Sequence, residues 1–151
     1  MSLADIIVVL REGRIEDHGP PDRLYLRPST RFAATFMGDS NLVDGTARDT
    51  VGERVDVETK FGTFSVPGRA NRDAAVTLAI RPEHLRADDT EGFQLGEGRV
   101  VDRHFIGAHQ RCRVALENTE LILNSPAKPP LAIDQIVRIS ADLDDFVLLE
   151  S

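Results

Sequence analysis

The chain has 151 residues, of which 41% are hydrophobic and 28% charged. This composition is typical of a folded globular protein and argues against wholesale disorder, and the length fits one domain or one domain with part of another. The net charge of −7 argues against nucleic acid as a partner, because nucleic-acid binding requires a basic surface.

The charge is distributed unevenly along the chain. Residues 1–38 carry five arginines and five acidic residues, so the whole net charge of −7 falls on the rest. No apolar run approaches the roughly 18 residues that a membrane-spanning helix requires, and no signal-peptide pattern is present. We therefore expect no direct insertion into the membrane. Met1-Ser2-Leu3 is expected to be a cloning leader ahead of native sequence.

The first predicted element is a β-hairpin. Residues 6–10 and 14–17 have the apolar character of short strands, and Glu12-Gly13 between them is a small-turn signal. The run Gly19-Pro20-Pro21-Asp22 then ends the second strand and begins a helix, because proline cannot donate to a sheet but suits a first helical turn.

Two short helices are predicted after the hairpin. Pro28 ends the first, and Ser29 or Thr30 is expected to cap the second. The second helix is expected to place Phe32, Ala33 and Phe36 on one apolar face and to stop at Gly38.

From Asn41 onward the pattern predicts strands, in segments rich in β-branched residues and separated by Gly, Pro or Asn. One cysteine, Cys112, lies in such an alternating run, which favours a buried small hydrophobic residue over a reactive thiol and excludes an internal disulfide. The predicted strands are 42–48, 54–59, 63–66, 76–81, 99–105, 110–116, 121–123, 136–141 and 146–149.

The β segment also resembles a duplication. A repeat of roughly fifty residues, with small loop insertions, predicts two similar β units. The matched pairs are Gly45 with Gly98, Asp49 with Asp102, Gly52 with Gly107, Val55 with Cys112, Val57 with Val114, Thr59 with Leu116, Phe64 with Leu121, Pro67 with Pro126 and Val76 with Val137.

Motifs for catalysis are missing from the sequence. It contains no G-x-x-x-x-G-K-[ST] loop to hold phosphates and no G-x-S-x-G elbow for a nucleophilic serine. We predict that this chain is not an enzyme by itself, with no catalytic, cofactor or metal residues. His104 and His109 flank a turn and could meet across it, but solvent-facing histidines are favoured, and the cluster Asp142, Asp144 and Asp145 is expected to be a solvated turn.

The sequence Arg81-Pro82-Glu83 lies within residues 78–85, at the end of a predicted strand. In a strand, Arg81 and Glu83 would point to the same side and could bind a partner subunit, or form an ion pair within the chain. Pro82 marks a sheet edge or a strand end.

Two segments together carry a family resemblance. Residues 4–41 resemble the last stretch of an ABC-transporter ATPase subunit of the importer class, with Ile6 where arginine is usual, and the Ile80-Arg81-Pro82-Glu83 element resembles the TOBE-type accessory domain that follows it. The resemblance implies a remnant of the ATPase domain over residues 1–38 and a TOBE-type β-barrel, similar to the oligomer-binding fold, over residues 39–151. ATP and Mg²⁺ would then be bound outside this chain, in the ATPase domain.

The implied function is regulation and dimerisation of an importer ATPase, with a second ATPase subunit and membrane permease subunits as partners. The implied location is the cytoplasm, peripheral to the inner membrane. The implied solute is a polyamine, iron(III), a sugar or a sulfate-like anion, and a polyamine is favoured. Two alternatives stay open: a stand-alone small-ligand or oxyanion sensor built from tandem barrels, and a nucleic-acid-binding barrel, which the acidic charge disfavours.

Overall fold

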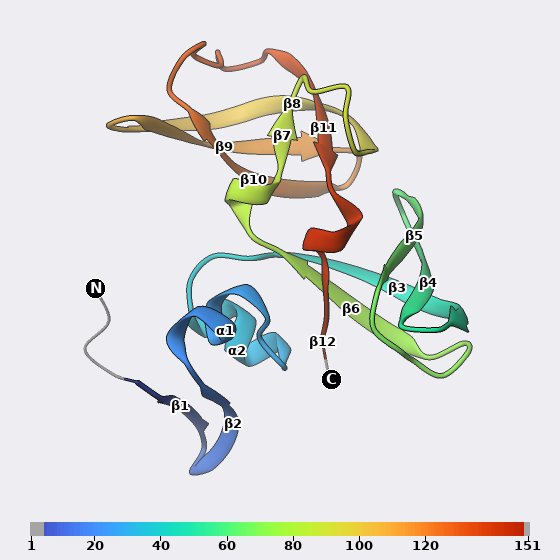
Figure 1. Ribbon diagram of the computed structural model, residues 1–151. Coiled ribbons are helices and arrows are strands. Elements are labelled where there is room, and N and C mark those ends of the chain that lie inside the picture. The colour runs from blue at the N-terminus through green and yellow to red at the C-terminus, as the bar shows by residue number, and fades with distance from the viewer. Residues whose placement is uncertain (1–4, 150–151) are drawn as a thin grey trace. The chain divides into compact units, whose positions relative to one another are not determined.

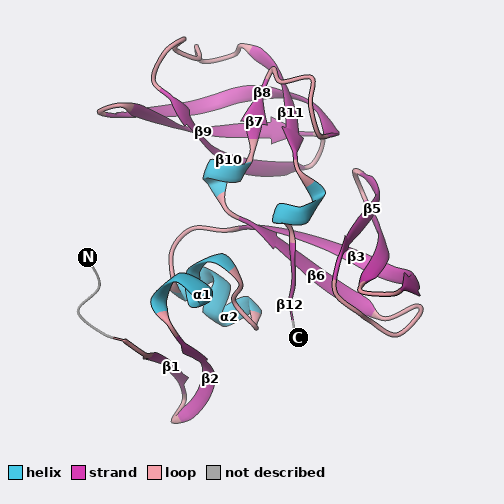
Figure 2. Cartoon of the chain, viewed as in Figure 1, coloured by secondary structure: helices cyan, strands magenta, loops and turns pink. Residues whose placement is uncertain are grey.

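The computed structural model describes residues 5–149 (Figure 1), so the predicted leader Met1-Ser2-Leu3 lies outside the described residues. The fold is mainly β with two short helices, as predicted (Figure 2). Two compact units are present: one combines the described residues up to Ala79 with the segment that begins at Phe146, and the other runs from Ile80 to Asp145. This division differs from the predicted boundary between residues 38 and 39. That residues 1–38 belong to an ATPase domain and residues 39–151 to a TOBE-type barrel stays a prediction.

The hairpin has its predicted form. Strands β1 (Ile7–Arg11) and β2 (Arg14–Gly19) pair antiparallel. Glu12 and Gly13 between them have positive φ angles of 51° and 77°, the conformation that a two-residue turn requires if it is to match the twist of the strands.

The two helices are α1 (Pro21–Leu26) and α2 (Arg31–Phe36). Of the two predicted caps, Thr30 is the one used: its side-chain oxygen accepts a hydrogen bond from the backbone N–H of Ala33 at 3.1 Å.

The prediction that Phe32, Ala33 and Phe36 form the apolar face of the second helix is partly wrong. Ala33 and Ala34 are fully buried, whereas the Phe36 side chain is 64% exposed and stacks on the Phe32 ring at 5.7 Å between centroids. Ala34 belongs to a core cluster with Ala79 and Leu149, where only small helix side chains allow a close approach to the sheet.

The first unit contains a five-stranded sheet. Phe64 and Phe146 form the aromatic centre of its core, with ring centroids 4.9 Å apart. Its strands lie in the order β12 (Val147–Leu149), β6 (Ala75–Ile80), β3 (Asn41–Val51), β4 (Arg54–Thr59) and β5 (Gly62–Pro67).

The second unit contains a sheet of the same size. Cys112 is fully buried in it, as predicted. Its strands lie in the order β10 (Thr119–Pro126), β9 (His109–Leu116), β8 (Phe93–Ile106), β11 (Ile136–Ala141) and β7 (Arg86–Ala87). Strand β7 was not predicted, because two residues give no alternating pattern.

The two sheets share one topology, as the duplication predicts. Strands β3 to β6 correspond in chain order to β8 to β11, and each sheet then takes its fifth strand from the end of the other repeat: β7 follows β6 in sequence but pairs with β11, and β12 follows β11 but pairs with β6. The pairs Val57 with Phe64 and Val114 with Leu121 occupy the same register.

One match within the duplication was wrong. Pro67 pairs with Arg54, and the equivalent register in the second sheet joins Arg111 to Asn124, two residues before Pro126.

Candidate functional site

Arg81 and Glu83, the predicted subunit-contact residues, do not lie in a strand. Strand β6 ends at Ile80, as Pro82 indicated, and a short 3₁₀ helix covers Pro82–His84. Arg81 is only 4% exposed, whereas Glu83 is exposed. The two side chains therefore do not share one strand face, and their role in contacting a subunit stays a prediction.

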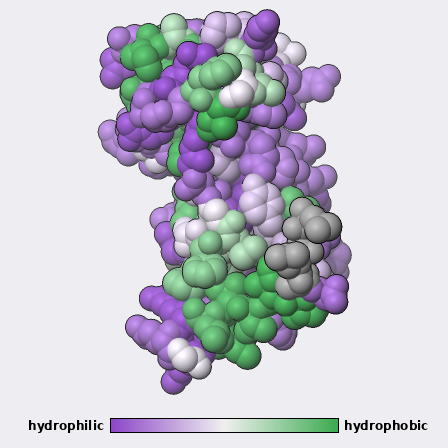
Figure 3. Space-filling view, turned by 90° about the vertical axis from the view of Figure 1, so that its left-hand side faces the viewer, coloured by the Kyte–Doolittle hydropathy of each residue, from purple (hydrophilic) through white to green (hydrophobic). Residues whose placement is uncertain are grey.

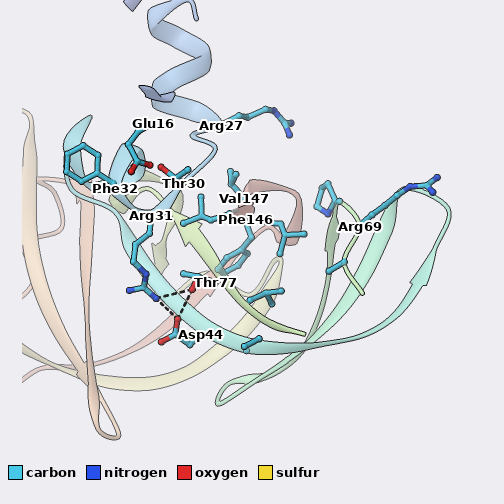
Figure 4. Close-up of a pocket in the computed structure, with 18 of the residues that line it drawn as sticks. Glu16, Arg27, Thr30, Arg31, Phe32, Asp44, Arg69, Thr77, Phe146 and Val147 are labelled. Atoms are coloured by element: carbon cyan, nitrogen blue, oxygen red, sulfur yellow. Dashed lines mark hydrogen bonds and ion pairs between the residues drawn. The ribbon is translucent and has the colours of Figure 1, made fainter. Parts of the chain in front are cut away.

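A groove of about 1140 Å³ lies within the first unit (Figure 4). One side is formed by the hairpin and α2, and the other by the first sheet, including the edge strand β12. Lining residues with charged side chains are Arg11, Glu16, Arg27, Arg31, Asp44 and Arg69.

Arg31, Asp44 and Thr77 are joined inside this groove (Figure 4). The Arg31 guanidinium donates to Asp44 Oδ1 at 2.7 Å and to Thr77 Oγ1 at 2.9 Å. The Thr77 hydroxyl in turn donates to Asp44 Oδ1 at 2.9 Å. These three contacts tie α2 to strands β3 and β6.

Two other cations of the groove, Arg11 and Arg69, are also close to acidic groups. Arg11 lies 3.9 Å from Glu16 and covers the Phe32 ring at 5.2 Å, and Arg69 contacts Glu53 at 2.7 Å. The charges of Arg11, Arg31 and Arg69 are therefore largely compensated by their acidic neighbours, which weakens their attraction for a free ion.

Asp17 holds the hairpin to the helices. Arg23 Nη2 contacts Asp17 Oδ1 at 2.5 Å, and the backbone N–H groups of His18 and Ser29 donate to the same carboxylate, each at 2.8 Å. Burial alone would raise the pKa of Asp17, but the hydrogen bonds from Arg23, Ser29 and His18 outweigh burial and hold the pKa below its ordinary value of 3.8.

The histidines do not meet. His104 Nε2 lies 3.3 Å from Asp102 Oδ2, whereas His109 pairs with Ile106 across the hairpin. Asp142 and Asp144 are exposed around the short 3₁₀ helix Leu143–Asp145. Within residues 5–149, no group of three or more His, Cys, Asp and Glu side chains is arranged to hold a metal ion.

An exposed apolar surface covers the outer face of the hairpin. Ile6, Val8, Leu10 and Ile15 are 58%, 49%, 56% and 63% exposed. Figure 3 shows hydrophobic surface gathered at the lower end of the view, where the hairpin lies. No helix among the described residues is long and apolar enough to cross a membrane.

Sequence reasoning did not identify the groove or the contacts of Arg31. One signal was available: matching Gly45 with Gly98 also places Asp44 on Glu97, so an acidic residue precedes the glycine in both repeats.

Comparison with known proteins identifies the family. A TOBE domain profile matches residues 78–149. The chain is 34% identical over 131 residues to a spermidine/putrescine import ATP-binding protein of Ruegeria pomeroyi, covering 85% of this chain and 36% of that protein. It is 31% identical over 159 residues to an sn-glycerol-3-phosphate import ATP-binding protein of Agrobacterium fabrum, covering 100% of this chain and 42% of that protein.

A solved structure has a similar fold. The cytoplasmic molybdate-binding protein ModG, in a molybdate-bound form, superimposes with a TM-score of 0.61 over 74% of this chain and 96% of its own, at 13% identity. At that identity the similarity concerns the fold alone. The chain spans well under half the length of the import proteins that it matches. It belongs to the TOBE-type C-terminal domains of ABC-importer ATP-binding subunits.

Proposed function

We propose that the chain is a regulatory and dimerisation part of the ATP-binding subunit of an ABC importer that takes up a polyamine. The observation that favours this solute class is that spermidine/putrescine import ATP-binding proteins recur among the similar proteins, in Ruegeria pomeroyi, Trichormus variabilis and Shigella boydii. In this proposal ATP and Mg²⁺ are bound by the ATPase domain of the subunit, outside these residues.

The hairpin supports a connection to a larger ATPase domain. Two strands alone cannot bury both of their faces, and here Val8 and Leu10 lie on the face that stays exposed while Val9 is 1% exposed on the other. Contiguous apolar surface of this kind is typical of an interface. We infer that the ATPase domain of the subunit covers it.

The partners in this proposal are a second copy of the subunit and the membrane permease. Glu83 is exposed and lies two residues after the buried Arg81, so the 3₁₀ turn can present a carboxylate to a partner while the arginine stays buried. Such a subunit would lie on the cytoplasmic face of the inner membrane through its permease, without entering the bilayer.

Affinity purification of the tagged subunit from detergent-solubilised membranes tests the assembly. We expect an integral membrane permease, identified by mass spectrometry, to co-purify with it. Recovery of the protein only from the soluble fraction, with no permease, would contradict the proposal.

A small-ligand or oxyanion sensor is the second candidate function. The observation in its favour is the tandem-barrel fold shared with a molybdate-binding protein. Titration with molybdate, sulfate and spermidine, followed by the melting temperature, separates the two, because a ligand that binds only the folded state raises that temperature. A rise with an oxyanion supports the sensor, and no rise with any of the three excludes it.

A further inference from the structure

Asp44 and Thr77 in the first sheet occupy the same places as Glu97 and Arg138 in the second. In the first repeat, the backbone N–H of Ala47 donates to the carbonyl of Ala74, and in the second, that of Val100 donates to Gln135, each at 2.9 Å. Three residues further along the strands from these bonds, Asp44 faces Thr77 in the first repeat and Glu97 faces Arg138 in the second. The strand register confirms that Glu97 pairs with Arg138, and a hydrogen bond joins Thr77 to Asp44.

The two repeats pair their acidic residue with a cation from different places. In the second repeat the cation comes from the facing strand, because Arg138 Nε lies 3.5 Å from Glu97 Oε1. In the first repeat the facing residue is Thr77, which carries no charge, and the cation comes from outside the repeat: Arg31, the first residue of α2, contacts both Asp44 and Thr77.

We propose that Arg31 is a positioning residue that fixes α2 on the first sheet by supplying the arginine that this repeat lacks at position 77. Thr77 is then as important as Arg31, since a threonine leaves space for the guanidinium and also accepts its second hydrogen bond. Ala33 and Ala34, both fully buried, follow in the same helix and allow close packing once Arg31 sets its place. This inference rests on contacts within each unit taken separately, so it stands independently of the transport assignment.

Thr77→Arg tests the proposal without altering α2 itself. The new arginine would oppose Asp44 as Arg138 opposes Glu97, and it would displace Arg31 by competition and by like-charge repulsion. We expect amide hydrogen exchange in Ala33–Phe36 to rise about two- to fivefold in Thr77→Arg and in Arg31→Gln, the size that an exposed ion pair with two hydrogen bonds allows. The double variant should exchange no faster than either single variant, because both remove the same contact.

Matched controls separate positioning from general loss of stability. Arg138→Gln removes the equivalent pair in the second repeat and should leave exchange in α2 unchanged. Arg31→Asp alone should speed amide hydrogen exchange in α2. Swapping the two charges, with Arg31→Asp and Asp44→Arg together, should restore slow amide hydrogen exchange. The proposal is overturned if Thr77→Arg leaves exchange in α2 unchanged, if the effects of Thr77→Arg and Arg31→Gln simply add, or if the charge exchange gives no rescue.

Discussion

Gly45 and Gly98 are equivalent residues that leave the same space for a facing strand. A Cβ atom on Gly45 would lie 2.6 Å from Val57 Cγ1 and 2.7 Å from the Glu58 carbonyl oxygen. A Cβ atom on Gly98 would lie 2.5 Å from Val114 Cγ1 and 2.9 Å from the carbonyl oxygen of Ala115. The two β units therefore share a packing detail as well as a topology.

Gly45→Ala and Gly98→Ala should each lower the free energy of unfolding by about 1–3 kcal/mol, because the added methyl group meets backbone that cannot move aside. Chemical denaturation measures the change. Gly107→Asn is the matched control: Gly107 has φ of 65° and open space around it, and asparagine tolerates that conformation. Equal losses for Gly98→Ala and Gly107→Asn would refute the steric explanation.

The duplication and most of the strands could be predicted from sequence because local pattern carries them. Cys112 and Val114 alternate with polar neighbours, and Gly45 and Gly98 punctuate the same place in each repeat. Strand β7 could not be predicted, because its two residues are a strand only through distant pairing with β11. The pairing of β12 with β6 could not be predicted either, because these two strands are far apart in the sequence.

The candidate site was harder to predict than the fold. Alternation suggested that Arg81 and Glu83 share a face, but Pro82 leads into a 3₁₀ turn and the alternation ends at Ile80. Periodicity also could not show that Ala34, and not Phe36, packs on the sheet, since the choice depends on how close the helix approaches. Arg31 meets Thr77 only in the folded chain.

Acid should weaken the attachment of the hairpin through Asp17. Its folded-state pKa lies below the ordinary value of 3.8, so the carboxylate contributes fully to stability above pH 3.8, and this contribution is lost as pH falls from there through the folded-state pKa. Asp17→Asn should be less stable near neutral pH and should lack this part of the acid dependence. Unfolding measured across this pH range provides the test, and parallel pH profiles for the two proteins would show that Asp17 contributes nothing to it.

Gln110→Leu should cost at least about 2 kcal/mol of unfolding free energy, because several buried polar groups lose their partner. Gln110 is 1% exposed; its Nε2 donates to the carbonyls of Pro126 and Pro129, and its Oε1 accepts from Arg103 and from the backbone of Leu131. Thermal or denaturant unfolding gives the comparison. Gln94→Leu, at an exposed glutamine whose Nε2 donates to the carbonyl of Asp89, should change stability by under about 0.5 kcal/mol. A Gln110 variant as stable as the Gln94 variant would contradict the role assigned to the buried amide.

Cys112 should react slowly with a thiol reagent while the protein is folded. Burial raises the pKa of its thiol above the ordinary value of 9.0, and the side chain is fully buried. Labelling with a maleimide, followed by mass spectrometry, should accelerate in denaturant in step with unfolding. Rapid labelling of the native protein would show that the second sheet opens locally around this residue.

Val8→Lys together with Leu10→Lys should reduce self-association of the chain, because lysines interrupt the apolar face of the hairpin. Sedimentation velocity at increasing concentration measures it. Val51→Lys provides the control, since Val51 is 77% exposed but lies at the end of β3, away from the hairpin in sequence. If the double lysine variant and Val51→Lys both self-associate as strongly as the parent chain, the hairpin face is not the surface through which the chain self-associates.

Uptake of radiolabelled spermidine tests the central claim most directly. A strain in which the gene encoding this chain is deleted should lose most of its spermidine uptake, retain uptake of glycerol 3-phosphate, and recover when the intact gene is returned. Unchanged spermidine uptake in the deletion strain would contradict the assignment to a polyamine importer.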